Sequence, residues 1–124
     1  MHKKLNKLIL IIDDSVDNQA LLKMIFEVNG FQVHCASNGK EALCLLQELS
    51  NLPNVILLDA QMPVMDGYQF RQEQSKNERI KDIPVVVMTG DDDSELYKKM
   101  IMPEGILMKP LHLNSLIESV SIHL

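Results

Sequence analysis

The chain has 124 residues, the length of one compact domain that buries about two thirds of its unfolded surface on folding. The formal net charge is −5, with 12 Lys and Arg against 17 Asp and Glu, so direct binding of nucleic acid is not expected. No apolar run reaches the roughly 18 residues of a membrane span, and the run 8–12 is too short for a signal peptide. We therefore expect one cytoplasmic domain over residues 1–124, with no membrane partner and no second catalytic or DNA-binding domain.

Five short apolar runs of strand length punctuate the chain. Four of them are nearly continuous, as in parallel strands that are covered on both faces, whereas residues 31–36 alternate and are typical of an edge strand. The five runs are residues 8–12, 31–36, 55–58, 85–88 and 106–108.

Helical patterns lie between these runs. Apolar residues at helical spacing predict three amphipathic stripes. The weakest helical pattern lies between residues 92 and 102. The stripes are Val16, Ala20, Met24 and Val28 with Leu21 and Ile25 beside them; Ala42, Leu45, Leu46 and Leu49; and Leu113, Leu116, Ile117 and Val120.

Turn and cap residues agree with this division. A short polar residue three positions before a Glu or Gln predicts helix starts at Asn38, Asp66 and Asp92. Asn29 and Gly30 suit a left-handed helix end. Strands and helices then alternate along the whole chain, which predicts an α/β fold with a doubly wound, parallel five-stranded sheet.

The sulfur-containing residues give no sign of a covalent framework. Cys35 and Cys44 form no C-x-x-C pair, so both are expected to be reduced thiols. The eight methionines are expected mainly to fill the core.

Polar side chains follow four of the five apolar runs, at the sheet edge where parallel α/β folds bind ligands. Asp13 and Asp14 follow the first run, Asp59 the third, Thr89 the fourth and Lys109 the fifth. Any one of these carboxylates alone could be an ordinary turn former. Two carboxylates about 4 Å apart repel by roughly 4 kcal/mol, so three of them need more countercharge than one lysine supplies. The pattern therefore predicts a site for Mg²⁺ and a phosphoryl group.

These residues carry a resemblance along essentially the whole chain. Residues 59–67 read D-x-x-M-P-x-M-D-G, and they stand between the Asp13-Asp14 pair and Thr89 followed by Lys109-Pro110. With these residues in this order, the chain resembles the response-regulator receiver domains of two-component signalling, of the chemotaxis-regulator kind. The resemblance implies a flavodoxin-like (βα)5 domain with strand order 2-1-3-4-5, no output domain within residues 1–124, and a cis peptide bond before Pro110.

The resemblance also implies a phosphorylation switch. Asp59 would accept a phosphoryl group from the phosphohistidine of a sensor histidine kinase or a histidine phosphotransfer protein. Lys109 would pair with the phosphoryl oxygens, and the Thr89 hydroxyl would donate to one of them. The implied Mg²⁺ ligands are Asp14, Asp13 mainly through water, Asp59, and the carbonyl oxygen of Gln61.

The implied output is altered binding of a downstream protein partner, with a phosphorylation-dependent homodimer as a further possibility. Such a domain is not an enzyme beyond self-catalysed phosphoryl transfer onto Asp59 and slow autodephosphorylation. Two alternatives stay open. A Mg²⁺-dependent phosphohydrolase on a similar scaffold is disfavoured because residues 13–15 lack the D-x-D signature, and a non-phosphorylated interaction module because the charged positions are intact.

Several positions depart from the family pattern. Ile106 stands where the family usually has Tyr or Phe, and Gly90 stands where it usually has Ala. Asn18, four residues after Asp14, resembles the D-D-x-x-x-N stretch of receivers attached to hybrid kinases, whereas Gln19 stands where those often have Arg. Both a free-standing regulator and a receiver excised from a hybrid kinase therefore stay open. Without the aromatic ring, we expect the output face to rearrange through the loop after Thr89 and through methionines. These are Met100, Met102 and Met108.

Overall fold

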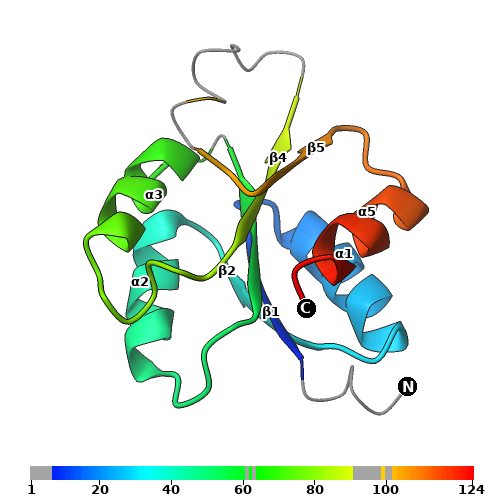
Figure 1. Ribbon diagram of the computed structural model, residues 1–124. Helices are drawn as coiled ribbons and strands as arrows, with labels where there is room; N and C mark the ends of the chain where they lie inside the picture. The colour runs from blue at the N-terminus through cyan, green and yellow to red at the C-terminus, as the bar shows by residue number, and fades with distance from the viewer. Residues whose placement is uncertain (1–6, 61, 63, 91–98, 100–101) are drawn as a thin grey trace.

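The computed structural model describes residues 7–60, 62, 64–90, 99 and 102–124. Within these ranges, five parallel strands form one sheet in the order β2-β1-β3-β4-β5, as predicted. Helices α1 and α5 cover one face of the sheet, and α2 and α3 cover the other (Figure 1). The strands are β1 (Leu8–Ile12), β2 (Gln32–Ala36), β3 (Val55–Asp59), β4 (Val85–Thr89) and β5 (Gly105–Met108); the helices are α1 (Val16–Val28), α2 (Gly39–Glu48), α3 (Gly67–Ser75) and α5 (Leu113–Ser121).

Two hydrophobic cores lie on the two faces of the sheet. In β1, Leu10 and Ile12 point into the core under α2 and α3, whereas Ile9 and Ile11 point into the core under α1 and α5. This alternation follows from the two-residue period of a strand. Every residue of β1, β3 and β4 is buried, as expected for strands with helices on both faces.

The two outer strands are less covered. In β2 only Val33 and Ala36 are buried, and the strand pairs with β1 alone at one end of the sheet, which confirms the predicted edge strand. In β5, Ile106 is 49% exposed and Met108 is 45% exposed, so the prediction that this strand is covered on both faces was wrong. A run of three apolar residues is too short to reveal a strand that buries one face only.

The apolar stripe predicted for α1 was also wrong, apart from Ile25, which packs against the core. Val16, Met24 and Val28 are 71%, 56% and 81% exposed, and the helix instead buries Leu22 and Phe26. Both sets fit the spacing of one helix face, so the spacing alone could not choose between them.

The turn after α1 explains which face is buried. Gly30 has a φ of 92°, the left-handed conformation predicted for this helix end. The Phe31 amide donates to the Phe26 carbonyl at 3.0 Å, and the two rings pack edge to face with centroids 5.8 Å apart. This aromatic contact joins the helix to the residue before β2, and both rings lie in the core under α1 and α5.

The stripes predicted for α2 and α5 are correct apart from one residue. Ala42, Leu46, Leu116 and Val120 are buried, and their predicted neighbours pack against the two cores. Leu113, at the start of α5, is 56% exposed.

The predicted helix starts are present where the structure covers them. Asp66 and Gln69 form a complete capping box at α3. At α2 the Asn38 side chain accepts from the Glu41 amide at 2.8 Å, but the Glu41 carboxylate accepts from the Ser37 amide instead of closing the box. The start predicted at Asp92 lies outside the described residues.

Six of the eight methionines can be placed, and the expectation that they mainly fill the core was too broad. Met62 and Met88 are buried, whereas Met24, Met102 and Met108 are exposed. Within the same ranges, no helix is both long enough and apolar enough to span a membrane.

Candidate functional site

Three carboxylates meet at the carboxyl edge of the sheet. One oxygen from each of Asp13, Asp14 and Asp59 lies within 4.8 Å of the others. Asp13 directly follows β1 and Asp59 ends β3, and these strands are neighbours in the sheet. The parallel pairing therefore brings together residues that are far apart in the chain.

The two carboxylate oxygens of Asp13 differ in their hydrogen bonding. One of its oxygens, Oδ1, accepts from the Ser15 amide at 2.9 Å. The other, Oδ2, is buried and has no hydrogen-bond donor among the residues that the structure describes. A buried carboxylate oxygen without a partner is unfavourable, because it has lost its water.

The carboxylate cluster fits a hard divalent cation. All three side chains offer oxygen ligands, and the exposed Asp14 leaves the cluster open to water on one side. Mg²⁺ prefers oxygen ligands and usually keeps several waters. Gln61, whose carbonyl oxygen is the fourth ligand expected from the resemblance, lies outside the described residues.

Lys109 extends from the end of β5 into the same cluster. Its Nζ atom is 3.2 Å from Asp59 Oδ1, and its backbone amide donates to the Thr89 carbonyl at 2.7 Å. The Lys109–Pro110 peptide bond is cis, as predicted. Among the residues that the structure describes, the Lys109 ammonium offsets one of the three carboxylates, which leaves the cluster acidic.

Thr89 ends β4, beside the strand that carries Asp59. Its side chain is fully buried, and its hydroxyl donates to the Met108 sulfur at 3.1 Å. Thr89 and Met108 are direct partners in the register of β4 and β5. This contact between the site and the edge strand could not be read from spacing along the chain.

Two residues that the sequence analysis did not place in the site form hydrogen bonds with Asp13, Gln19 with its backbone and Ser15 with its side chain. Gln19 donates from Nε2 to the Asp13 carbonyl at 2.6 Å and to Ser37 Oγ at 3.1 Å, so it joins the ends of β1 and β2. Ser15 caps α1 by accepting from the Asn18 amide at 3.2 Å. A serine just before a helical pattern is a recognisable cap, whereas the contacts of Gln19 exist only in three dimensions.

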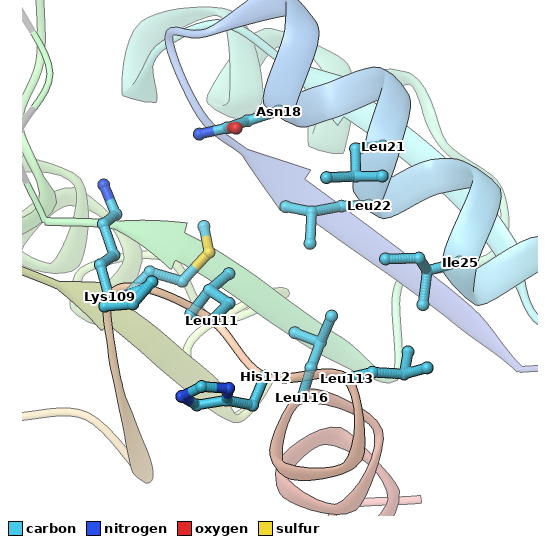
Figure 2. A pocket seen from close by; sticks show the side chains of 11 residues that line it. Asn18, Leu21, Leu22, Ile25, Lys109, Leu111, His112, Leu113 and Leu116 are labelled. Carbon is cyan, nitrogen blue, oxygen red and sulfur yellow. The ribbon is translucent and has the colours of Figure 1, made fainter.

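An apolar pocket of about 410 Å³ opens beside Lys109, between α1 and the start of α5. Figure 2 shows Leu21, Leu22 and Ile25 of α1 facing the leucines of the other wall, with Asn18 and Lys109 on opposite walls at the same end. The pocket therefore joins an apolar wall to the polar site. The second wall consists of Leu111, His112, Leu113 and Leu116.

A doubly wound sheet with acidic, hydroxyl and ammonium side chains at its carboxyl edge defines a class of signalling domain. Residues 9–121 match the model of the response regulator receiver domain family. The chain belongs to this family, and it is a receiver domain of two-component systems. Such domains are signalling modules and not enzymes of the ordinary kind.

Relatives of known name agree with this assignment. Protein PilH of Pseudomonas aeruginosa is 30% identical over 115 residues, which cover 91% of this chain and 93% of PilH. Regulatory protein AtoC of Escherichia coli is 40% identical over 82 residues, which cover 66% of this chain but only 17% of AtoC. The signal receiver domain of a signal transduction histidine kinase from Syntrophus aciditrophicus has a similar structure, with a TM-score of 0.86, 28% identity, and coverage of 94% of this chain and 89% of that one.

Proposed function

We propose that this domain accepts a phosphoryl group on Asp59 from a phosphohistidine, with Mg²⁺, and signals through altered binding of a protein partner. The observation that carries the proposal is the setting of Asp59. Its carboxylate is buried, it lies within 4.8 Å of the Asp13 and Asp14 oxygens, and it contacts the Lys109 ammonium at 3.2 Å. This arrangement suits a nucleophile that attacks a negatively charged phosphorus centre.

The transfer is an in-line displacement. A carboxylate oxygen of Asp59 forms the new O–P bond while the P–N bond of the phosphohistidine breaks, and the electron pair returns to the imidazole nitrogen. Lys109 offsets charge on the phosphoryl oxygens, and the Thr89 hydroxyl donates to one of them. The protein's contribution is positioning and charge neutralisation, as in other phosphoryl transfers.

The metal has a defined place in this scheme. Asp13, Asp14 and Asp59 would hold Mg²⁺, with the Gln61 carbonyl as a fourth ligand. When bound, Mg²⁺ supplies positive charge next to the transferring group. The buried Asp13 Oδ2 supports this assignment, because it is an acceptor for which the described residues offer no donor and which a bound cation would satisfy.

The phosphodonor would be a sensor histidine kinase or a histidine phosphotransfer protein, acting in the cytoplasm. The pocket beside Lys109 supports this, because it offers an apolar wall next to the phosphoryl site. An apolar helix face of the donor that carries its phosphohistidine at one end fits that combination. Receiver domains also act on downstream partners, and a phosphorylation-dependent homodimer is one form that such an output could take.

Labelling with a small phosphodonor tests the proposal. With Mg²⁺ and phosphoramidate or acetyl phosphate, the wild-type domain should gain one phosphoryl group, seen as a mass increase. Asp59→Asn, which keeps the shape of the side chain, should gain none. Equal labelling of both proteins would refute the proposal, and steady turnover of a phosphate monoester would favour a phosphohydrolase instead.

A further inference from the structure

The Thr89 hydroxyl connects the buried site to the protein surface. It donates to the Met108 sulfur at 3.1 Å. Thr89 is fully buried, whereas Met108 is 45% exposed, so this hydrogen bond links a core residue to a surface residue. Met108 also lines a surface hollow of about 380 Å³ between β5 and α5.

The hydrogen bond is one that a phosphoryl group can displace. A thioether sulfur is a weak acceptor, whereas a phosphoryl oxygen is a charged and strong one. A hydroxyl has a single proton, so it cannot donate fully to both acceptors at once. A phosphoryl group within reach of Thr89 therefore competes with Met108 and has the advantage.

The neighbouring residue on the same face of β5 cannot take this role. Ile106 lies two positions before Met108, and it is 49% exposed. Its aliphatic side chain has no polar atom with which to follow the hydroxyl. Met108 has both an acceptor and three flexible side-chain torsions, so it can change its rotamer when the hydroxyl leaves.

We propose that Met108 reports the state of Thr89 at the surface of this domain. Without a phosphoryl group, the Met108 sulfur holds the Thr89 hydroxyl. After phosphorylation of Asp59, the hydroxyl turns to a phosphoryl oxygen, the Met108 side chain is released, and the hollow between β5 and α5 changes shape. Met108 is thus a positioning residue, and its role rests on the proposed phosphorylation of Asp59.

Methyl NMR of methionine tests this directly. In protein labelled with ¹³C at the methionine methyl groups, Met108→Leu assigns the Met108 signal. Saturating beryllofluoride with Mg²⁺, a phosphoryl mimic at Asp59, should shift the Met108 signal and leave that of Met24, on the exposed side of α1, in place. In Thr89→Val the Met108 signal should start at a new position and not respond to the mimic.

The outcomes separate the two proposals. A wild-type Met108 signal that stays in place while the mimic binds, as seen by the ¹⁹F signal of bound beryllofluoride, would overturn the role of Met108 and leave the proposed function standing. Failure of the mimic to bind at all would overturn both.

A matched pair of variants gives a second test. Met108→Leu removes the acceptor at similar volume, so the unphosphorylated state loses a hydrogen bond and the mimic should bind about threefold more tightly. Met108→Gln offers a stronger acceptor at an exposed position, so the mimic should bind about threefold more weakly. Equal affinities for the Leu and Gln variants would contradict the proposed competition.

Discussion

The candidate site has two halves that the fold supports differently. The carboxylates stand at the ends of β1 and β3, whose residues are buried throughout. Met108, the partner of Thr89, ends β5, and Lys109 directly follows this strand, of whose four residues only one is buried. A metal site needs fixed ligands, whereas a switch needs a part that can move at low free-energy cost. Under the proposed function, the buried strands would hold the metal ligands, and the exposed edge would supply Lys109 and carry the signal.

The largest expected effect is on stability, and it contrasts the two halves. Leu57, in the middle of β3, is fully buried, and Ile106 on β5 is half exposed. Leu57→Ala should lower the free energy of unfolding by about 2–5 kcal/mol, because it leaves a cavity in the core. Ile106→Ala should lower it by only about 1 kcal/mol. Urea unfolding of both variants measures the difference, and similar losses would break the distinction.

The next effect is on phosphoryl transfer. Lys109→Met keeps much of the side-chain length but removes the ammonium that contacts Asp59. The rate of labelling by phosphoramidate should fall by about a hundredfold, because charge on the phosphoryl oxygens is no longer offset. Mg²⁺ affinity should not fall, because the three carboxylates are intact. If Lys109→Met also lost Mg²⁺ affinity, Lys109 would be supporting the three carboxylates as well.

Asp13→Asn should weaken Mg²⁺ binding, which Lys109→Met leaves unchanged, and should stabilise the metal-free domain. Removing one of three clustered negative charges should raise the free energy of unfolding in EDTA by about 1 kcal/mol. Mg²⁺ affinity should fall by at least about tenfold, so added Mg²⁺ should stabilise the variant less than the wild type. Unfolding with and without Mg²⁺ measures both effects. A variant that is less stable than wild type in EDTA would contradict the repulsion argument.

A smaller effect is expected at Gln19, which supports the Asp13 backbone. Gln19→Ala loses the hydrogen bonds to the Asp13 carbonyl and to Ser37, so it should lower the free energy of unfolding by about 1 kcal/mol. Labelling should also slow by a few fold. Lys23→Ala, an exposed position on the same helix, is the matched control and should change stability by less than about 0.5 kcal/mol.

The smallest effect is a pH dependence at Cys35 on the edge strand β2. Burial raises the pKa of the Cys35 thiol above its ordinary value of 9.0, although the nearby Lys23 lowers it. A raised pKa in the folded state means that the contribution to stability is complete below pH 9 and is lost as pH rises through the folded-state pKa. Relative to Cys35→Ala, the wild type should therefore lose stability above pH 9. A difference in free energy of unfolding between the two proteins that stays the same at every pH would contradict this.

The parts of the fold that were predicted correctly have local causes. Buried parallel strands are nearly continuous apolar runs, so β1, β3 and β4 were visible in the sequence. Gly30 and the Asp66 capping box mark helix ends through the conformations that these residues favour. The convergence of Asp13, Asp14 and Asp59 followed from one further rule, that the carboxyl ends of parallel strands share an edge.

The sequence by itself therefore determined the element order, the polar residues at the sheet edge and the family. Tertiary packing decided which face of α1 is buried, because the contact between Phe26 and Phe31 selected one of two stripes with the same spacing. It also decided that β5 is half exposed and that the Thr89 hydroxyl meets Met108. Each of these outcomes depends on a contact between different elements, and the spacing of residues within one element carries no information about its neighbours.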